Sequence, residues 1–137
     1  MSALKITILG CGSSFGVPLF HNIWGKCDPE EPKNKRSRPS ILVQKNGKNL
    51  LIDTSPDLKQ QILSNKIDNI DAVFFTHEHA DHTHGINELR SINLIHRKII
   101  PCYGNEQTMD KITNSFNYLF ENTEKSYYPA ILSKNHF

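Results

Sequence analysis

The segment that most constrains this chain is a short apolar run, residues 72–76, followed at once by the pattern His77-x-His79-x-Asp81-His82. The apolar run is rich in β-favouring side chains and predicts a buried strand. Four of the seven histidines of the chain lie within residues 77–84, directly after this strand. Sheets in α/β proteins usually carry their functional sites at such strand ends. The sequence therefore predicts an α/β fold with a cluster of metal-ligand side chains at one edge.

The spacing within this pattern indicates how the side chains are used. His77 and His79 point to the same side of an extended segment, so their imidazoles can reach one cation. The chain then turns, and Asp81 and His82 face a neighbouring position. Neutral imidazoles suit zinc, iron, nickel or copper, and the carboxylate extends the choice to manganese. The alternative, a polar loop with incidental histidines, is disfavoured because each position has its own ligand role.

The remaining hydrophobic pattern predicts a mixed α/β (α+β) fold. The expected strands cover residues 4–9, 40–44, 49–53, 72–76 and 98–103, and the expected helices cover 55–65, 86–95 and 105–120. Asn46-Gly47 between two apolar runs predicts a hairpin. Four prolines between residues 18 and 39 exclude a continuous helix there and predict a long functional loop.

Composition narrows the class of protein. A chain of 137 residues is the size of one domain, and its net charge of +2 is too small to indicate a nucleic-acid or membrane partner. Three widely spaced cysteines give no disulfide framework. The apolar stretch at residues 4–9 is too short for the core of a signal peptide, and no run approaches the length of a membrane span. A cytoplasmic location without membrane contact is expected.

Residues 76–82 resemble the signature of the metallo-β-lactamase fold superfamily of metal-dependent hydrolases. Residues 6–18, 24–29, 38–40 and 51–58 resemble, in the same order, the branch that contains the cyclic-phosphate phosphodiesterase of phosphonate breakdown. The match runs from about Lys5 to Arg90, with weaker similarity at Tyr127-Tyr128-Pro129. It implies the N-terminal half of an αββα sandwich, with a mixed sheet and helices on one face. Residues 1–137 would form a single domain that lacks its C-terminal half.

The resemblance also implies roles for individual side chains. His77 and His79 match ligands of a first metal, and Asp81 and His82 match ligands of a second. The implied cofactors are two divalent ions, zinc or manganese, which activate a hydroxide for phosphodiester hydrolysis. Asp81 would also act in catalysis by orienting that nucleophile. Asp53 falls where the family has an acidic residue at a strand end, and it either orients a ligand histidine or is a turn residue before a helix.

Some polar residues near these motifs have no expected ligand role, and others have two alternative roles. Glu78 and His84 match no ligand position. Arg36 and Arg38 belong to a charged run that either contacts a substrate phosphate or is a solvated loop. A small phosphorylated substrate is the expected partner, and a nucleic acid is less favoured. Cys11 is expected to be a small buried thiol.

The glycines at positions 10, 12 and 16 follow a predicted strand, as a dinucleotide-binding loop would. A proline-rich loop follows them instead of a helix, so they are interpreted as a tight turn beside the metal site.

The expected ligand set is incomplete within this chain. Each metal needs at least three protein ligands or a bridging group, and the resemblance places the remaining ones in a later half. His136 lies in a terminus that is expected to fray, so it is not expected to serve. The apolar face of the sheet would need a C-terminal half or self-association to cover it. The sequence thus predicts a metal-dependent, phosphodiesterase-type hydrolase, with a non-catalytic metal-binding or self-associating remnant as the alternative.

Overall fold

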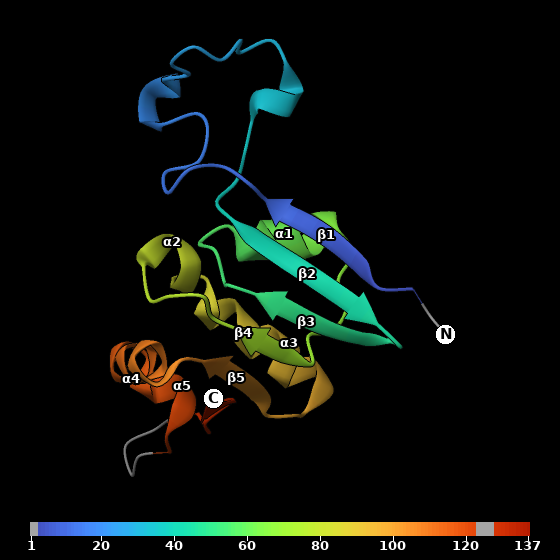
Figure 1. Cartoon of the computed structure of the whole chain (residues 1–137), viewed down its shortest axis with the longest axis vertical. Helices are drawn as coiled ribbons and strands as arrows, with labels where there is room; N and C mark the ends of the chain where they lie inside the picture. The colour runs from blue at the N-terminus through green and yellow to red at the C-terminus, as the bar shows by residue number, and fades with distance from the viewer. Residues whose placement is uncertain (1–2, 123–127) are drawn as a thin grey trace.

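A computed structural model describes residues 3–122 and 128–137 and contains one mixed six-stranded sheet (Figure 1). The strand order follows the sequence: β1 (Lys5–Gly10), β2 (Ser40–Lys45), β3 (Lys48–Ile52), β4 (Ala72–Phe74), β5 (Ile100–Gly104) and β6 (Leu132–His136). β1, β2 and β3 pair antiparallel, and β3 to β6 pair parallel. The mixed sheet expected from the sequence is confirmed. Tyr127 of the weaker match lies outside the described residues.

The turn between β2 and β3 forms as its sequence predicts. Asn46 and Gly47 have φ angles of 51° and 73°, and Lys45 pairs with Lys48 across the turn. Two successive positive φ values define the hairpin turn that Asn-Gly favours, because both residues tolerate the left-handed region. This turn sets the register in which Leu42 lies opposite Leu51.

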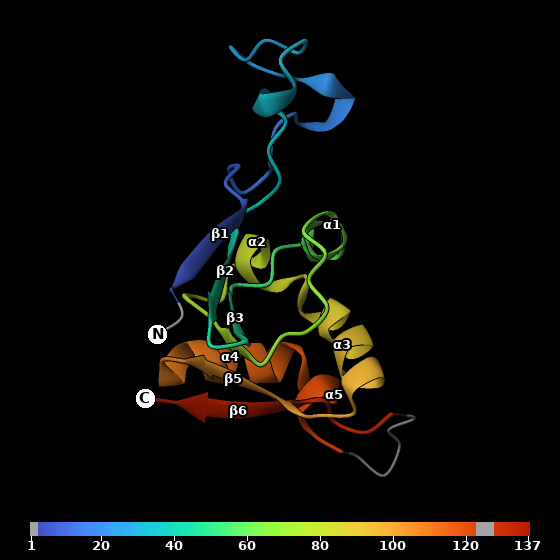
Figure 2. The same cartoon turned by 90° about the vertical axis from the view of Figure 1, so that its right-hand side faces the viewer.

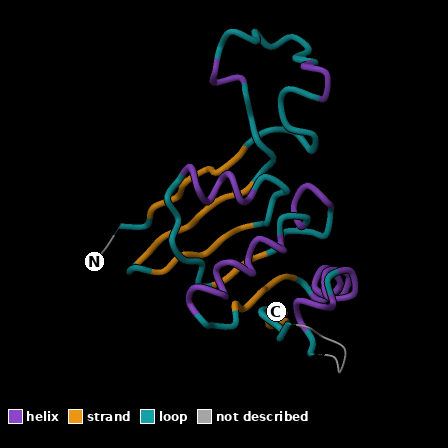
Figure 3. Tube along the Cα trace, turned by 180° about the vertical axis from the view of Figure 1, so that it is seen from behind, coloured by secondary structure: helices purple, strands orange, loops and turns teal. Residues whose placement is uncertain are grey.

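The helices cover one face of the sheet, as Figures 2 and 3 show from two sides. They are α1 (Leu58–Ser64), α2 (Ala80–Thr83), α3 (Leu89–His96), α4 (Glu106–Ser115) and α5 (Asn117–Phe120), with a 3-10 turn at Ile86–Glu88. Leu51 and Val73 are adjacent in register and fully buried beneath these helices. Within the described residues, no helix has the length and apolar character needed to cross a bilayer.

The other face of the sheet is apolar, and no helix of the described residues covers it; Phe137 stacks on Phe74 with ring centroids 5.7 Å apart. One row across five strands consists, in register, of Ile8, Ile41, Ile52, Phe74 and Tyr103. Ile8 is 65% exposed. This face points toward the viewer in Figure 1, with α1 and α3 behind it. The sequence-based concern about an uncovered apolar sheet face therefore applies to this structure.

Three local expectations were wrong. The helix expected from 105 to 120 breaks at Phe116, whose φ of −124° and ψ of 37° are not helical, so α4 and α5 are separate. α1 begins at Leu58 rather than at residue 55, because the Ser55 side chain and carbonyl accept from Asp57 N and Leu58 N in a tight turn. His136 is not in a frayed end: it pairs with Gly104 at the end of β6. The sequence of β6 is too polar to predict a strand. Its backbone hydrogen bonds with β5 stabilise the strand instead.

Residues 11–39 form an arm that projects from the end of β1 (Figures 1 and 2). It contains two 3-10 turns, Phe20–Asn22 and Pro32–Asn34, and otherwise irregular chain, as the prolines predict. Gly12 N donates to Ser37 O at 2.7 Å where the two ends of the arm meet. A Cβ on Gly10 would lie 2.2 Å from Arg38 O, and one on Gly12 would lie 2.7 Å from Arg36 O. These two glycines therefore permit close backbone approach at the base of the arm.

Candidate metal centre

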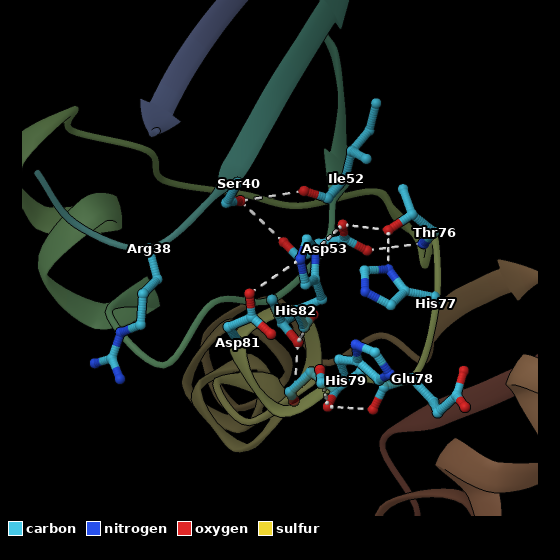
Figure 4. A network of polar contacts seen from close by, with 12 residues as sticks. Arg38, Ser40, Ile52, Asp53, Thr76, His77, Glu78, His79, Asp81 and His82 are labelled. Carbon is cyan, nitrogen blue, oxygen red and sulfur yellow. Dashed lines mark hydrogen bonds and ion pairs between the residues drawn. The ribbon is translucent and has the colours of Figure 1, made fainter. Parts of the chain in front are cut away.

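Two strand ends bring the candidate ligands together (Figure 4). Asp53 follows the end of β3, and residues 76–79 follow the end of the parallel strand β4. Parallel strands present their carboxyl ends at the same edge of the sheet, so both segments reach one place. α2 begins after His79 and returns Asp81 and His82 to the same point. The histidine segment and Asp53 are thus neighbours in space although they lie far apart in the chain.

Asp53 is a buried carboxylate at the centre of a hydrogen-bond network. Its side chain is 6% exposed. Its Oδ1 accepts from Thr76 N at 2.8 Å, and its Oδ2 accepts from Thr76 Oγ1 at 2.6 Å. Oδ2 also lies 2.7 Å from His82 Nδ1. Three donors on one carboxylate hold it in a single orientation. Asp53 itself adopts φ of 61°, a conformation that Asp tolerates better than most residues.

These contacts determine which ring nitrogens are free. The Thr76 hydroxyl has one hydrogen, which it donates to the Asp53 carboxylate. The 3.0 Å contact between Thr76 Oγ1 and His77 Nδ1 is therefore a bond in which the ring donates. His82 likewise donates from Nδ1 to Asp53. In the neutral form of a ring that donates from Nδ1, Nε2 keeps its lone pair, as a metal ligand requires.

The distance between His82 and Asp81 can be compared with the spacing of two ligands on one metal ion. His82 Nε2 lies 3.2 Å from Asp81 Oδ2. A lone pair and a carboxylate at this distance repel unless a proton or a cation lies between them. Two ligands of one tetrahedral zinc, each about 2.0–2.1 Å from the ion, are separated by roughly 3.3 Å. The donor chemistry and spacing of this pair fit a divalent transition metal.

The histidine rings lie against one another. The ring centroid of His77 is 4.6 Å from that of His79 and 4.1 Å from that of His82. His82 and Asp81 are 19% and 17% exposed, so the cluster is open to solvent at one side. Within residues 3–122 and 128–137, no group of three His, Cys, Asp or Glu side chains is arranged to hold an ion. The His77 ring thus contacts both of the other histidine rings.

Backbone contacts fix the histidine segment to the turn after Asp53. Thr54 N donates to His82 O at 2.8 Å, and Gly85 N donates to Thr54 O at 3.0 Å. A Cβ on Gly85 would lie 1.8 Å from Ser55 O, so only glycine allows this approach. Thr83 Oγ1 donates to His79 O at 3.0 Å and closes the first turn of α2. The position of His82 is therefore determined by both its side chain and its backbone.

Glu78 and His84, for which the sequence gives no ligand role, have other partners. Glu78 forms an ion pair with Lys111 of α4 at 2.5 Å, and this hydrogen bond lowers the pKa of the Glu78 carboxyl. The His84 ring lies edge-on to Phe116, with centroids 5.7 Å apart. Both line a cavity of about 310 Å³ between α2 and α4.

Neither arginine of the predicted phosphate contact belongs to the histidine cluster itself. Arg38 donates from Nε and Nη2 to the two oxygens of Asp57, at 2.9 and 2.7 Å. Arg36 donates to Lys33 O at 2.7 Å and to Cys11 Sγ at 2.8 Å. The expectation that Cys11 is buried was wrong: its thiol is exposed, because the chain leaves the sheet at this residue. The phosphate role of both arginines stays a prediction.

Sequence reasoning assigned no role to Thr76, Asp57 or Gly85. Thr76 lies inside the recognised pattern, but only the folded structure shows that its hydroxyl links Asp53 with His77. The sequence gives a weak indication for Gly85, since glycine is the residue that permits another backbone segment to approach closely. Asp57 carries none, because its partner Arg38 lies 19 residues earlier in the chain.

Comparison with known proteins identifies relatives of this chain. A family model described as a beta-lactamase superfamily domain matches residues 48–134, more than half of the chain. An octanoyltransferase from Porphyromonas gingivalis is 39% identical over 128 residues, which are 93% of this chain and 25% of that protein. A ribonuclease Z from Methanopyrus kandleri is 34% identical over 76 residues, covering 53% of this chain and 27% of the relative.

Solved structures are similar to this chain over nearly its whole length. A diphosphatase from the PhnP family has a TM-score of 0.80 and 34% identity, over 98% of this chain and 51% of that one. Zn(2+)-bound PqqB from Methylobacterium extorquens has a TM-score of 0.69 over 98% of this chain and 46% of its own; at 20% identity it shows the fold alone. This chain thus spans about half of the solved structures and a quarter of the two curated relatives. A match to a quarter of the octanoyltransferase does not indicate which part carries the named activity.

Proposed function

Because this chain belongs to the metallo-β-lactamase superfamily, we propose that it is the histidine-bearing half of a hydrolase that cleaves phosphodiester or diphosphate bonds with divalent metal ions. The observation that carries the proposal is the contact of His82, which donates from Nδ1 to Asp53 and directs Nε2 at Asp81. Buried carboxylates that orient ligand histidines are characteristic of metal sites.

The chemistry of the relatives supports the choice of bond. The family includes a diphosphatase and a ribonuclease Z, both of which cleave bonds to phosphorus. The diphosphatase is similar over 98% of this chain. The octanoyltransferase and the ribonuclease Z are each matched over about a quarter of their length, so the diphosphatase, matched over 51% of its chain, carries the choice of bond.

In this proposal each residue of the cluster has its own role in metal binding or hydrolysis. His77 and His79 would hold one ion, and Asp81 with His82 a second, with zinc or manganese as the fitting metals. Bound divalent ions supply Lewis-acid activation of water and of the phosphoryl oxygens. Asp53 keeps His82 in the tautomer that exposes Nε2. The Asp81 carboxylate orients the attacking water by accepting its hydrogen.

A metal titration tests the first half of the proposal. The chain is titrated with zinc and with manganese in competition with a chromophoric chelator, beside the double variant His77→Ala/His79→Ala. We expect the variant to lose binding. A variant that still folds and binds as the wild type does would overturn the ligand assignment.

A hydrolysis assay tests the second half. The chain is joined to the part of the PhnP-family diphosphatase that it does not match, and hydrolysis of bis(p-nitrophenyl) phosphate is followed. We expect turnover that depends on added metal and on Asp81. A folded, metal-loaded chimera without turnover on phosphodiesters or diphosphates would contradict the proposed activity.

The uncovered sheet face favours a second function, self-association of a non-catalytic remnant. Ile6 and Ile8 are 61% and 65% exposed on this face. Contiguous exposed apolar surface of this kind marks an interaction site or an aggregation hazard. A chain that forms stable dimers, binds metal and never supports hydrolysis in the chimera would favour this function over the enzyme.

A further inference from the structure

A groove lies between the projecting arm and α1. Its volume is about 1070 Å³, and it is lined by arm residues 15–21 and 23, by residues 35–38 at the base of the arm, and by residues of α1 and its flanks. This volume is slightly above the range of about 300–1,000 Å³ that is usual for small-molecule sites. Its walls come from two elements that Arg38 and Asp57 hold together through a bidentate ion pair.

The arm supplies the apolar part of the groove. Phe15 is 75% exposed and Phe20 is 91% exposed, although both are large aromatic side chains. Leu19 and Ile23, also lining residues, are 42% and 55% exposed. Four large apolar side chains on one short segment, facing a shared hollow, are more than the scattered single residues of an ordinary surface.

The base of the arm supplies positive charge. Lys35, Arg36 and Arg38 line the groove, and Asp57 is the one carboxylate among the lining residues. Asp57 is already paired with Arg38. The Arg36 guanidinium is oriented by neutral acceptors, Lys33 O and Cys11 Sγ, so its charge is not compensated by them. The groove therefore combines an apolar wall with the Arg36 cation, whose hydrogen-bond acceptors are neutral.

The groove also adjoins the candidate metal centre. Figure 4 shows Arg38 on the Asp81 side of the histidine cluster. The hydrogen bond to Asp57 raises the pKa of Arg38, and the charge of Asp81 raises it further. A ligand held at the histidine cluster can thus extend past Arg38 toward the arm.

We infer that this groove binds the non-reacting portion of the substrate, and that the substrate is an anionic phosphoester carrying an aryl or similarly flat apolar group. The apolar group contacts Phe20 and its neighbours, and Arg36 contacts an anionic oxygen of a phosphoryl group that is not cleaved. This inference rests on the proposed function, which it sharpens from phosphoesters in general to apolar-substituted ones. Charge complementarity and the exposed aromatic wall select this chemistry over a purely polar sugar phosphate.

Direct binding tests the inference without catalysis. The chain is kept in EDTA, and binding of 1-naphthyl phosphate, 1-naphthol and inorganic phosphate is measured by fluorescence or calorimetry. We expect naphthyl phosphate to bind at least about tenfold more tightly than either partial ligand, because only it uses both walls. Phe20→Ser and Arg36→Gln should each weaken its binding by about tenfold. Phe20 is exposed, so its replacement does not threaten the fold.

Two control variants separate this groove from other surfaces. Lys59→Gln removes a charge from α1 outside the groove lining, and Ile8→Ser changes the open sheet face. Neither should alter naphthyl phosphate binding. Binding that falls with Ile8→Ser but not with Phe20→Ser would place the ligand on the sheet and overturn the inference, as would equal affinity for all three probes. Because EDTA removes metal from this assay, its failure is distinguishable from failure of the proposed function, which the metal titration and the chimera measure.

Discussion

The Asp53 carboxylate lies 2.7 Å from His82 Nδ1, although 29 residues separate the two in the chain. The contact joins the turn after β3 to α2, and Thr76 from the end of β4 donates to the same carboxylate. One buried side chain thereby fixes the relative positions of three segments. The arrangement of the candidate ligands depends on it.

Replacing Asp53 with Asn should weaken zinc binding by roughly 10–100-fold. The amide retains one acceptor oxygen, but its NH₂ group then faces hydrogens on Thr76 and His82. His82 would take the other tautomer, and its Nε2 would lose the lone pair. Zinc affinity of the variant, measured by chelator competition, checks this result.

Asp71→Asn is the matched control for this substitution. Asp71 also accepts a backbone hydrogen bond, from Asn49 N at 2.9 Å, and it pairs with Lys98 at 3.1 Å. It lies before β4, at the opposite end of the strand from the histidine segment. The control should lose about 1–2 kcal/mol of unfolding free energy and keep its zinc affinity. Equal zinc affinity in both variants would refute the orienting role of Asp53.

Thr76→Val should reduce zinc affinity less than the change at Asp53. Valine keeps the shape of threonine, but it removes the hydroxyl that orders His77 and donates to Asp53. The ring of His77 then samples both tautomers, at an expected cost of about threefold to tenfold in affinity. Thr108→Val, at a buried position outside the candidate metal centre, should leave metal binding unchanged. Zinc affinity is measured by the same chelator competition. If Thr76→Val binds zinc as tightly as the wild type, Thr76 does not orient His77.

Gly85→Ala should destabilise the fold by about 3 kcal/mol or more, because the new methyl group would meet Ser55 O at 1.8 Å. Gly25→Ala separates this steric effect from backbone strain. Gly25 has φ of 60° and open space around its Cβ position, so its replacement should cost about 1 kcal/mol. Urea unfolding of both variants gives the comparison, and equal losses would show that the approach of Gly85 to Ser55 is looser than described.

The open sheet face should drive self-association of this chain. Ile6→Ser should lower the sedimentation coefficient or weaken the dimerisation constant by about tenfold, because it removes exposed apolar area from the β1 edge of this face. Leu63→Ser is a close control: Leu63 is also 61% exposed, but it lies on α1 on the other side of the sheet. Equal effects of the two changes, or a monomeric wild type, would show that this face does not mediate contact.

Acid should weaken the link between the arm and α1. The hydrogen bonds from Arg38 lower the pKa of Asp57 below its ordinary value of 3.8. A carboxyl with a depressed folded pKa stabilises the protein above its unfolded pKa, and this stabilisation is lost as pH falls through the folded pKa. Both side chains are about 30% exposed, at 31% and 28%, so the contribution is about 1 kcal/mol.

Arg38→Gln should therefore flatten the stability profile between about pH 5 and pH 2 by that amount. Urea unfolding at several pH values measures it. Lys111→Gln, which breaks the exposed pair with Glu78, should change the profile far less. A steeper acid dependence in Arg38→Gln than in the wild type would contradict the pairing.

Local pattern was sufficient for much of the fold. The hairpin at Asn46-Gly47, the strand before the histidine pattern and the irregular arm all form where the sequence predicts them, because turn chemistry, apolar runs and prolines act over a few residues. β6 was missed for the complementary reason. Its polar alternation is not a strand signal, and it becomes a strand only because β5 offers an edge to pair with.

The sequence by itself determined which side chains are available for metal chemistry, since residue types and their spacing are local properties. Only the tertiary structure decided how they are held. The bond between Asp53 and His82, the relay through Thr76 and the approach of Gly85 to Ser55 each join segments brought together by parallel pairing of β3 with β4. No local pattern encodes such contacts, because they depend on the register and order of strands across the whole sheet.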